Sequence, residues 1–306
     1  MKRSIRFIII GFFQIIILSV ISGADLRVAT YNLKNYLIMD RIVDGRWRPA
    51  YPKPESEKTI IRQVIKRTSA DILLLQEIGS LALLEELRDD LALEGLDYCY
   101  IKLMKASDLD RSLGVLSKYY PKNVILHDDL TFKYFNSQEF VKRGMLEISF
   151  SLENNQVLQL FGVHLKSRYT DNKNDPGSMI RRELEARACR NRLIERTLDQ
   201  GLKNYLVAGD FNDNPISASR RRFYQKGDIK IGSLVPATDS RGESWTYSYK
   251  KESNYETIDG FIASPVILER IQAGEGRIMD LPEALNGSDH RLVYIDIGKS
   301  VKADFQ

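Results

Sequence analysis

Residues 204–215 read NYLVAGDFNDNP, an apolar run that ends in a glycine, a carboxylate and an amide. The apolar run predicts a buried strand. Gly209 permits a tight turn where that strand ends, and Asp210 and Asn212 point the same way if the chain is extended. A carboxylate can orient or deprotonate water, and an amide can donate to an anionic oxygen. The alternative is a plain strand-to-turn connection, because residues 213–215 form a turn signal by themselves.

Four other short motifs also place polar side chains beside apolar runs. They are ATYNL at 29–33, LLLQEI at 73–78, FGVHLKS at 161–167 and SDHRL at 288–292, and they carry Asn32, Glu77, His164, Asp289 and His290. A carboxylate or imidazole at the end of a buried strand costs free energy unless it is paired or binds a metal. One such placement is ordinary, but five in one chain indicate a shared site.

The adjacent Asp289 and His290 can perform different tasks. Asp289 can bind a metal while His290, which titrates near neutral pH, transfers a proton or stabilises a developing negative charge. Such a histidine usually needs an acidic partner, and we expect Asp259, near the start of the predicted strand 258–263, to be that partner. The alternative for Asp259 is a capping or turn carboxylate.

Glu77 and Asp289 are the carboxylates that we expect to hold a divalent cation. Mg²⁺ prefers one or two protein carboxylates together with water, and Asn32 either adds an amide oxygen or orients a bound water. Taken alone, Glu77 is equally compatible with a structural role, because a glutamate that opens the predicted helix 80–93 is favoured by the helix dipole.

His164 is one of only three histidines in the chain. It ends the predicted strand 157–164, and this context favours a role in the site over a structural role. His127, beside two aspartates, is expected in a surface loop.

Three basic side chains are candidate phosphate contacts: Arg143, Lys166 and Arg168. The predicted helix 178–200 also carries many arginines. Because glutamates lie among them, we expect these arginines to form a solvated face rather than a binding surface.

The first 24 residues have the composition of a secretory signal peptide. A positive start precedes an apolar run at 7–21, and residues 22–24 are small. The run is shorter than the roughly 20 residues of a spanning helix, which favours cleavage over an uncleaved membrane anchor. We therefore expect export to the periplasm or the extracellular space, a single catalytic domain at 25–306, and no membrane anchor after cleavage.

Without the signal peptide the chain is nearly neutral. The full sequence has 45 basic and 41 acidic residues, and three basic residues leave with 1–24, so 42 basic residues remain against 41 acidic ones. Net charge therefore gives no argument for nucleic-acid binding, although local patches still matter. Cys99 and Cys189 are the only cysteines; they form either one disulfide or two separate buried thiols, and they lack zinc-type spacing.

Hydrophobic periodicity predicts helices and strands in two similar halves. Helices are expected at 57–67, 80–93 and 178–200. Strands are expected at 26–31, 72–75, 97–103, 112–118, 122–126, 144–151, 157–164, 204–208, 244–249, 258–263 and 291–297. Residues 37–56 are expected to be irregular, because a tryptophan and three prolines interrupt any pattern. This order indicates two packed sheets with helices outside.

The five motifs in this order resemble those of the endonuclease/exonuclease/phosphatase superfamily, which has the DNase-I-like fold, and in particular its bacterial secreted members. The resemblance covers nearly all of residues 25–298. It implies an α/β fold, a four-layer α/β/β/α sandwich of two mixed sheets. It also implies hydrolysis of a phosphoester by in-line attack of water, with Mg²⁺ as the cofactor and Mn²⁺ or Ca²⁺ as alternatives.

The resemblance also implies a role for each motif residue. Glu77 is similar to the main metal ligand of the family, and Asn32 and Asp289 complete the metal and water shell. Asp210 resembles the residue that orients or deprotonates the attacking water, and Asn212 resembles a phosphate-binding amide.

The two histidines have counterparts as well. His290 resembles the phosphate-contacting acid/base, held by Asp259, and His164 resembles the second histidine of secreted DNases and phosphatases. The acidic partner of His164 has no clear match, although Asp108 and Asp110 lie upstream. The tyrosine that some members place against the phosphate is not assigned.

Three functional hypotheses follow. The first is an exported nuclease or related phosphodiesterase that acts on nucleic acid as a monomer. The second is a phosphatase or sphingomyelinase-like enzyme for inositol phosphates, lipids or other small phosphoesters, whose lipid version is weakened because no exposed aromatic hairpin is evident. The third, a non-catalytic binding protein, is disfavoured by the presence of Glu77 and His290. Trp245, Tyr247 and Tyr249 either stack on a base or pack in the core.

Overall fold

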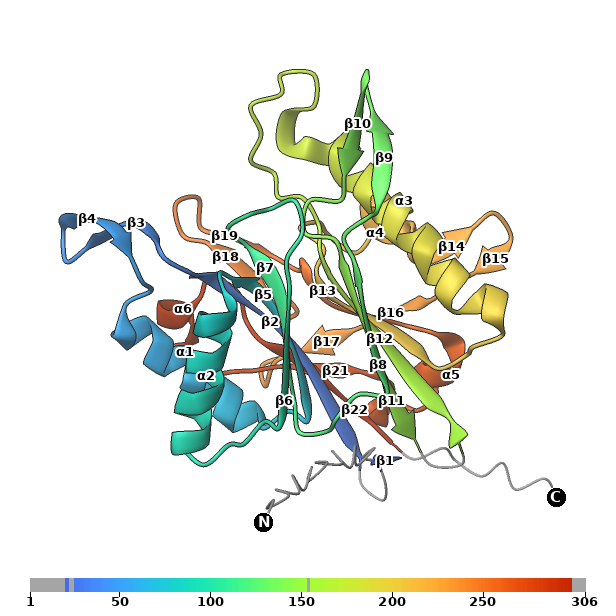
Figure 1. Cartoon of the computed structure of the whole chain (residues 1–306), viewed down its shortest axis with the longest axis horizontal. Coiled ribbons are helices and arrows are strands. Elements are labelled where there is room, and N and C mark those ends of the chain that lie inside the picture. The colour runs from blue at the N-terminus through green and yellow to red at the C-terminus, as the bar shows by residue number, and fades with distance from the viewer. Residues whose placement is uncertain (1–19, 22–24, 153–154, 299–306) are drawn as a thin grey trace, which may run out of the picture.

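Two seven-stranded sheets face each other in the computed structural model, which describes residues 20–21, 25–152 and 155–298 (Figure 1). The first sheet has the strand order β17 (Ala237–Thr238), β21 (Gly276–Ile278), β22 (Val293–Ile297), β2 (Leu26–Tyr36), β5 (Ile72–Ile78), β7 (Ser112–Ser117) and β6 (Tyr100–Met104). The second sheet has the order β1 (Val20–Ile21), β11 (Met145–Leu152), β12 (Val157–His164), β13 (Tyr205–Asp210), β20 (Asp259–Ala263) and β16 (Ser233–Val235), and β11 also pairs with β8 (Asn123–His127). Both sheets are mixed, since each contains parallel and antiparallel neighbours.

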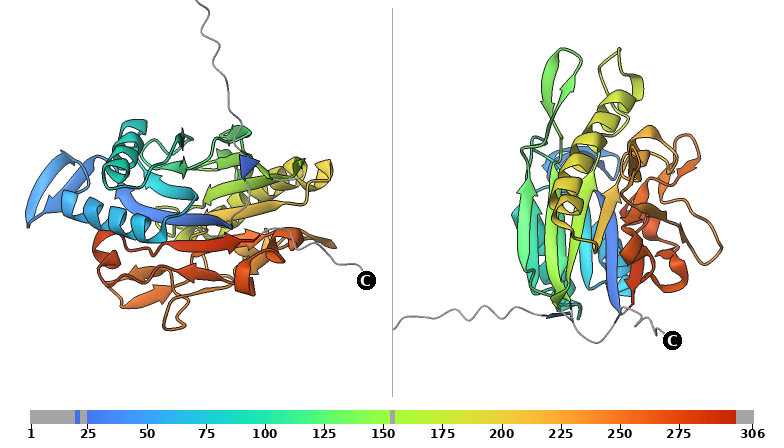
Figure 2. Two further views of the ribbon diagram at one scale, coloured as in Figure 1. Left: turned by 90° about the horizontal axis from the view of Figure 1, so that it is seen from below. Right: turned by 90° about the vertical axis from the view of Figure 1, so that its right-hand side faces the viewer.

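Helices cover the outer face of each sheet (Figure 2). The first sheet packs against α1 (Glu55–Thr68) and α2 (Leu81–Leu93), and the second packs against α3 (Met179–Arg196). Three hydrophobic cores hold these layers together, one between the sheets and one under the helices on each side. The prediction of a four-layer α/β/β/α sandwich of two mixed sheets is confirmed.

The central strands are apolar on both faces because both faces are covered. In β2, Val28 lies in the core between the sheets and Ala29 lies under the helices. In β13, Leu206 lies between the sheets and Val207 packs toward α3. Side chains of a strand alternate between its faces, so a strand covered on both sides has a continuous apolar run. This is why short uninterrupted runs in the sequence predicted these strands correctly.

Smaller elements surround the sandwich. Three two-stranded ribbons are β9 (Thr131–Tyr134) with β10 (Ser137–Phe140), β14 (Gln225–Lys226) with β15 (Ile229–Lys230), and β18 (Tyr247–Tyr249) with β19 (Asn254–Glu256). Short helical segments are η2 (Pro176–Ser178), η3 (Leu198–Gln200), α4 (Ala218–Arg221), α5 (Pro265–Leu268), η4 (Gln272–Gly274) and α6 (Ala284–Gly287).

The prediction that residues 37–56 are irregular is wrong, because this segment contains a fourth ribbon. β3 (Met39–Val43) pairs with β4 (Arg46–Tyr51). The turn residues Asp44 and Gly45 have φ angles of 51° and 71°, as a type I′ turn requires. The prolines misled the prediction because Pro49 lies in an exposed ribbon, where a missing N–H group costs little.

The same ribbon exposes an apolar pair. Ile42 and Trp47 are cross-strand partners and are 72% and 63% exposed. In Figure 1 the ribbon projects from the body of the molecule at its left edge. The expectation that the chain lacks an exposed aromatic hairpin is therefore also wrong.

Two expectations about charged surface residues are corrected by tertiary contacts. His127 does not lie in a surface loop but ends β8, is buried, and places Nε2 2.8 Å from Oε2 of Glu147. In α3, Arg182 and Glu185 are buried rather than solvated. The Glu185 carboxylate accepts hydrogen bonds from the backbone N–H groups of Lys142 (3.1 Å) and Lys166 (2.8 Å). A buried charge needs such partners, and here distant segments supply them.

The two cysteines are separate thiols, with Cys99 exposed and Cys189 buried. The signal peptide expected at 1–24 lies outside the described residues except for Val20–Ile21, which form β1 beside β11. Within the described part of the chain, none of the helices has both the length and the apolar character needed to cross a membrane.

Gly209→Ala is expected to lower the free energy of unfolding by about 3 kcal/mol or more. Gly209 lies inside β13 with a φ of 148°, and a Cβ there would lie 1.9 Å from the carbonyl oxygen of Val163 on β12. In the control Gly201→Ala, φ is 69° but the new Cβ meets nothing within 4 Å, so the cost should be about 1 kcal/mol. Urea unfolding measures both, and equal losses would contradict the tight approach of the two strands.

Candidate active site

The ends of three adjacent strands bring three polar side chains together. His164 ends β12 and is the register partner of Asp210, which ends the parallel strand β13. Asp259 begins the antiparallel strand β20 and is the register partner of Asp210 on the other side. All three residues are buried. Residues far apart in the sequence thus meet because strand pairing places them in one row.

Asp210 is the centre of this row and is only 1% exposed. Its Oδ2 accepts a hydrogen bond from Asn32 Nδ2 at 3.0 Å, and its Oδ1 accepts one from the backbone N–H of Asn212 at 2.7 Å. Burial, followed by the negative charge of Asp259, raises the pKa of Asp210 to about 7, although His290 and these hydrogen bonds oppose the shift. A carboxylate with this pKa exchanges protons near neutral pH.

Asn212 reaches the site by a turn rather than by strand alternation. Its φ is 52°, in the left-handed region that asparagine tolerates. The amide Nδ2 donates to the carbonyl of Leu165 at 2.9 Å and lies 3.3 Å from Asp210 Oδ2. The expectation that Asp210 and Asn212 share a face of an extended chain is wrong, but the two side chains still meet.

His290 is held by Asp259, as the sequence predicted. Nδ1 of His290 lies 2.9 and 3.1 Å from the two carboxylate oxygens of Asp259, and Nε2 lies 4.0 Å from Asp210 Oδ2 and 3.9 Å from Asp289 Oδ1. Burial alone lowers the pKa of His290, but the surrounding carboxylates, Asp259 above all, raise it to about 10. The imidazole is therefore a cation at neutral pH.

His164 has the opposite character. Burial, followed by the positive charge of Arg143, lowers the pKa of His164 well below its ordinary value, so the ring is neutral. Its Nε2 lies 3.5 Å from Asp210 Oδ2 and 4.0 Å from Glu77 Oε1, and Nδ1 has no hydrogen-bond partner among the described residues. We assign the proton to Nε2, where both carboxylates lie.

The acidic neighbours of His164 are thus Asp210 and Glu77 rather than the upstream aspartates. Asp108 binds Arg143 instead, with Nε of Arg143 2.8 Å from Oδ2 of Asp108. Asp110 is exposed. The strand register that joins His164 to Asp210 is not visible in the sequence, which explains why this partner was not found.

Glu77 lies in β5, three residues before Ser80 caps α2, so it does not open that helix. Its φ is 63° and the register of β5 shifts between Gln76 and Ile78. Bulges of this kind redirect a side chain, and a non-glycine residue in this region stores about 1–3 kcal/mol of strain. The backbone N–H of Asn35 donates to Oε2 of Glu77 at 2.7 Å.

Two of the three predicted metal ligands offer carboxylate oxygens to a hard divalent cation, whereas Oδ1 of the buried Asn32 already accepts the backbone N–H of Lys34 at 2.9 Å. Glu77 and Asp289 are partly exposed, with side chains 17% and 25% accessible, and a cation with several waters needs such access. Lys34 Nζ lies 3.9 Å from Asp289 Oδ2, and Arg111 Nε lies 3.9 Å from Glu77 Oε2. These distances exceed hydrogen-bond length, so both carboxylates keep oxygens that can bind a metal.

A second group of potential ligands lies deeper. Atoms of Asp210, Asp259 and His290 come within 4.8 Å of one another. However, His290 uses Nδ1 to bind Asp259, and its positive charge opposes cation binding. We therefore favour Glu77 and Asp289 as the metal carboxylates.

The three basic side chains that were candidate phosphate contacts differ in position, and Arg168 is paired with Glu256. The Arg143 guanidinium is buried beside the site, between Asp108 and the carbonyl of Leu165 (3.4 Å). Lys166 instead directs Nζ to the carbonyls of Ser167 (3.0 Å) and Tyr169 in the loop after β12. Lys166 holds this loop, and its role as a phosphate contact gains no support from the geometry.

Comparison with known proteins places this arrangement in a family. The model of the endonuclease/exonuclease/phosphatase family matches residues 29–290, a range that includes every motif residue from Asn32 to His290. The chain belongs to this family. Its members hydrolyse phosphoester bonds with divalent metals, so the chain is a metal-dependent phosphoesterase.

Solved structures of this family share the fold. A family member from Bacteroides vulgatus is 17% identical with a TM-score of 0.62, covering 90% of this chain and 99% of its own. Sphingomyelinase C from Streptomyces griseocarneus is 15% identical with a TM-score of 0.59, covering 90% and 100%. A beta toxin mutant from Staphylococcus aureus with bound magnesium ions is 13% identical with a TM-score of 0.60, also covering 90% and 100%. No curated protein sequence matches the chain significantly.

Two further residues lie beside the candidate site, and the sequence analysis did not place them there. Tyr247 is the bridge partner of His290, and the two rings lie 4.8 Å apart between centroids. Ser288 donates from Oγ to the carbonyl of Asn32 at 2.8 Å and accepts from the backbone N–H of His290 at 3.1 Å. Ser288 directly precedes the Asp289–His290 motif and was a detectable signal, whereas only tertiary structure places Tyr247.

In the metal-free protein, the imidazole of His290 should stay doubly protonated at neutral pH and titrate near pH 10. This folded pKa exceeds the unfolded value of about 6.5. The stability that His290 contributes is therefore complete below about pH 6.5 and is lost as the pH rises through about 10. NMR of chelator-treated protein tests this, with His290→Gln to assign the signal. Asp259→Asn should move the titration well below that of the wild type, because Asp259 is the main cause of the raised pKa; a wild-type titration near the ordinary value of about 6.5 would contradict the ion pair.

Proposed function

We propose that this chain is an exported Mg²⁺-dependent phosphodiesterase that hydrolyses nucleic acid by in-line attack of water. The observation that carries the proposal is the row of His164, Asp210 and Asp259, which joins His290 on one side and Glu77 on the other. This group contains a carboxylate that titrates near neutral pH, a neutral imidazole and a cationic imidazole. Hydrolysis of a phosphodiester needs a proton acceptor for water and positive charge or donors for the phosphoryl oxygens.

In this proposal Glu77 and Asp289 hold the metal, and Asn32 orients its water shell. Mg²⁺ is favoured because the ligands are hard oxygen donors, with Mn²⁺ and Ca²⁺ as alternatives, and the beta toxin structure carries magnesium ions on the same fold. A bound divalent cation supplies Lewis-acid polarisation of a phosphoryl oxygen.

The protein groups then divide the proton chemistry. Asp210 orients the attacking water and accepts its proton, since a pKa of about 7 allows it to act as a base at neutral pH. Asn212 supplies amide hydrogens to a phosphoryl oxygen. His290 is protonated and contributes positive charge or a proton, while His164 donates from Nε2 as a neutral group; both rings approach Oδ2 of Asp210.

Nucleic acid is the first choice of substrate because a cavity lined with tyrosines opens beside Asn212. Flat aromatic side chains bind bases by stacking in a sequence-tolerant way. The second candidate is a lipid phosphodiester. It is favoured by the exposed pair Ile42 and Trp47 on the β3–β4 ribbon, since exposed apolar clusters mark partner or membrane surfaces. The likeness to a sphingomyelinase agrees with this second candidate.

The remaining parts of the proposal concern the form of the protein. The composition of residues 1–24 supports export with cleavage of a signal peptide. We propose that residues 25–306 act as one domain and as a monomer. The periplasm or the extracellular space is the corresponding location.

Glu77→Gln, Asp210→Asn and His290→Gln should each lower turnover by about 10²-fold or more, because each removes a different part of the site. Circular dichroism and thermal unfolding check that the variants fold. In calorimetry, Glu77→Gln should also weaken Mg²⁺ binding. The exposed residue Glu269 provides the matched control Glu269→Gln, which should behave as the wild type. Full turnover in all three site variants would refute the assignment.

A substrate panel distinguishes the two candidate functions. Residues 25–306 and Glu77→Gln are incubated with plasmid, single-stranded DNA, RNA, inositol phosphates and sphingomyelin, with Mg²⁺ or with chelator. Metal-dependent cleavage of nucleic acid that is absent in the variant supports the nuclease. Intact nucleic acid together with release of phosphate or phosphocholine from a small substrate would favour the second candidate instead.

A further inference from the structure

A cavity of about 420 Å³ adjoins the candidate active site. Its walls come from the loop at 167–169 after β12 and from the ribbon β18–β19. Its lining includes Tyr169, Tyr247, Tyr249 and Asn212. We refer to it as the tyrosine cavity. Its volume lies within the range of about 300–1,000 Å³ that is common for small-molecule sites.

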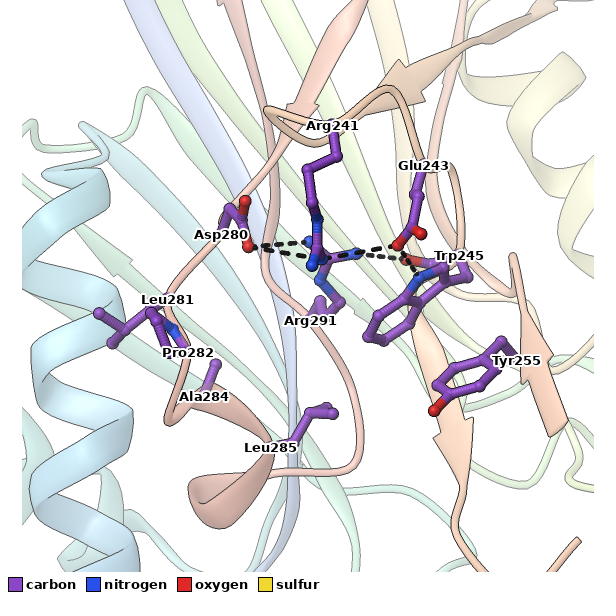
Figure 3. A pocket seen from close by; sticks show the side chains of 10 residues that line it. All are labelled: Arg241, Glu243, Trp245, Tyr255, Asp280, Leu281, Pro282, Ala284, Leu285 and Arg291. Carbon is purple, nitrogen blue, oxygen red and sulfur yellow. Dashed lines mark hydrogen bonds and ion pairs between the residues drawn. The ribbon is translucent and has the colours of Figure 1, made fainter. Parts of the chain in front are cut away.

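One face of the ribbon β18–β19 lines the tyrosine cavity, and the opposite face lines a second cavity. Tyr247 pairs with Glu256 and Tyr249 pairs with Asn254 across the two strands, and all four line the tyrosine cavity. Between them, Ser248 pairs with Tyr255, which points away because neighbouring residues of a strand alternate in direction. Figure 3 shows Tyr255 in a second cavity. Tyr247 and Tyr249 thus line the tyrosine cavity, and Tyr255 of the same ribbon lines the second cavity.

The second cavity differs in chemistry from the first. The Tyr255 ring lies 4.8 Å from the ring of Trp245, which is covered by the guanidinium of Arg291 at 4.1 Å (Figure 3). Arg291 is in turn held by Asp239 at 2.8 Å. Protein groups already cover these aromatic faces, so Tyr255 in the second cavity is a suitable control position.

The walls of the tyrosine cavity are fixed to each other. Arg168 in the loop forms a two-pronged ion pair with Glu256 on β19, with one contact of 2.7 Å. Glu256 also accepts a hydrogen bond from Asn254 Nδ2 at 2.7 Å. On the loop side, the ammonium of Lys166 binds the carbonyls of Ser167 and Tyr169. These contacts hold the loop against the ribbon, so the cavity is formed before any ligand enters.

The cavity is also fixed relative to the reacting groups. Tyr247 forms a backbone bridge with His290, and the backbone N–H of Ser248 donates to the carbonyl of Asp289 at 2.9 Å. Asn212, which also lines the cavity, hydrogen-bonds to Asp210 through its backbone N–H. The cavity therefore adjoins Asp210 and His290, the groups proposed to act on the scissile phosphate.

We propose that the tyrosine cavity receives the nucleobase next to the scissile phosphate. This inference rests on the proposed function and specifies its substrate. The base stacks on the tyrosines, and its polar edge meets side chains such as Asn254 and Ser167, which carry hydrogen-bonding groups.

A quaternary ammonium group is the main competing ligand, because aromatic side chains also bind such cations. The structure favours the base for two reasons. The negative charge of Glu256 is already balanced by Arg168, and Glu252, the other carboxylate of the lining, is exposed to solvent at the turn of the ribbon. In addition, amide and hydroxyl groups line the cavity beside the tyrosines, and these match the edges of a base whereas a quaternary ammonium has no N–H or O–H to share.

The test compares Tyr249→Ala with Tyr255→Ala, a matched change on the same ribbon. One substrate is a single-stranded oligonucleotide, and the other is the same strand with tetrahydrofuran abasic residues around the cleaved position. Tyr249→Ala should raise KM about tenfold on the base-containing strand and leave KM on the abasic strand within about twofold. Tyr255→Ala should leave both values unchanged. Thermal unfolding checks that both variants fold.

A binding arm separates failure of this inference from failure of the proposed function. Calorimetry measures nucleoside 5′-monophosphate, ribose 5-phosphate and phosphocholine with the wild type and both variants. Weaker binding of the nucleotide alone in Tyr249→Ala supports the cavity even if no nucleic acid is cleaved, in which case only the nuclease proposal fails. Cleavage of nucleic acid with Tyr249→Ala equal to Tyr255→Ala would overturn the cavity assignment. Selective loss of phosphocholine binding in Tyr249→Ala would overturn it as well.

Discussion

The hydrogen bond between Asn32 and Asp210 is the contact on which the site depends. Asn32 belongs to β2 of the first sheet and Asp210 ends β13 of the second, so this bond of 3.0 Å joins the two sheets where the functional residues lie. A buried carboxylate is costly without donors. The donors of Asp210 come from the opposite sheet and from its own turn at Asn212. The packing of the two sheets therefore determines whether the buried carboxylate of Asp210 receives its hydrogen bonds.

The electrostatics of the site follow from this burial. Asp210 and Asp259 are both carboxylates in one buried row, and two adjacent negative charges are unfavourable there. The cationic His290 offsets the charge of Asp259, and the pKa of Asp210 is raised. Nδ1 of His164 has no such carboxylate partner among the described residues, and this ring stays neutral. Two histidines whose Nε2 atoms lie 3.5 and 4.0 Å from the same oxygen of Asp210 thus have different charges, which is how acid and base roles are separated.

Sequence reasoning found most of this fold because its central strands are short apolar runs and its helices have regular apolar spacing. It selected the candidate residues that the structure brings together because a polar residue beside a buried strand is unusual. It could not find the contacts that depend on register: Asp210 beside His164, Glu147 beside His127, or the buried Glu185 under two backbone N–H groups. The ribbon at 39–51 was missed for a local reason, since prolines outweighed the Asp44–Gly45 turn signal.

The proposed proton chemistry and the proposed substrate binding lie in different parts of the fold. The residues that we propose exchange protons lie at or close to the ends of sheet strands, which are buried on both faces and rigidly spaced. The tyrosine cavity is built by a ribbon and a loop outside the two large sheets. Tyr247 connects the two regions, because it lines the cavity and also lies against the ring of His290. A ligand stacked on Tyr247 would thus contact a residue that packs against His290. The cavity and the buried row are therefore coupled through Tyr247, so a change of the cavity lining at this residue also reaches His290.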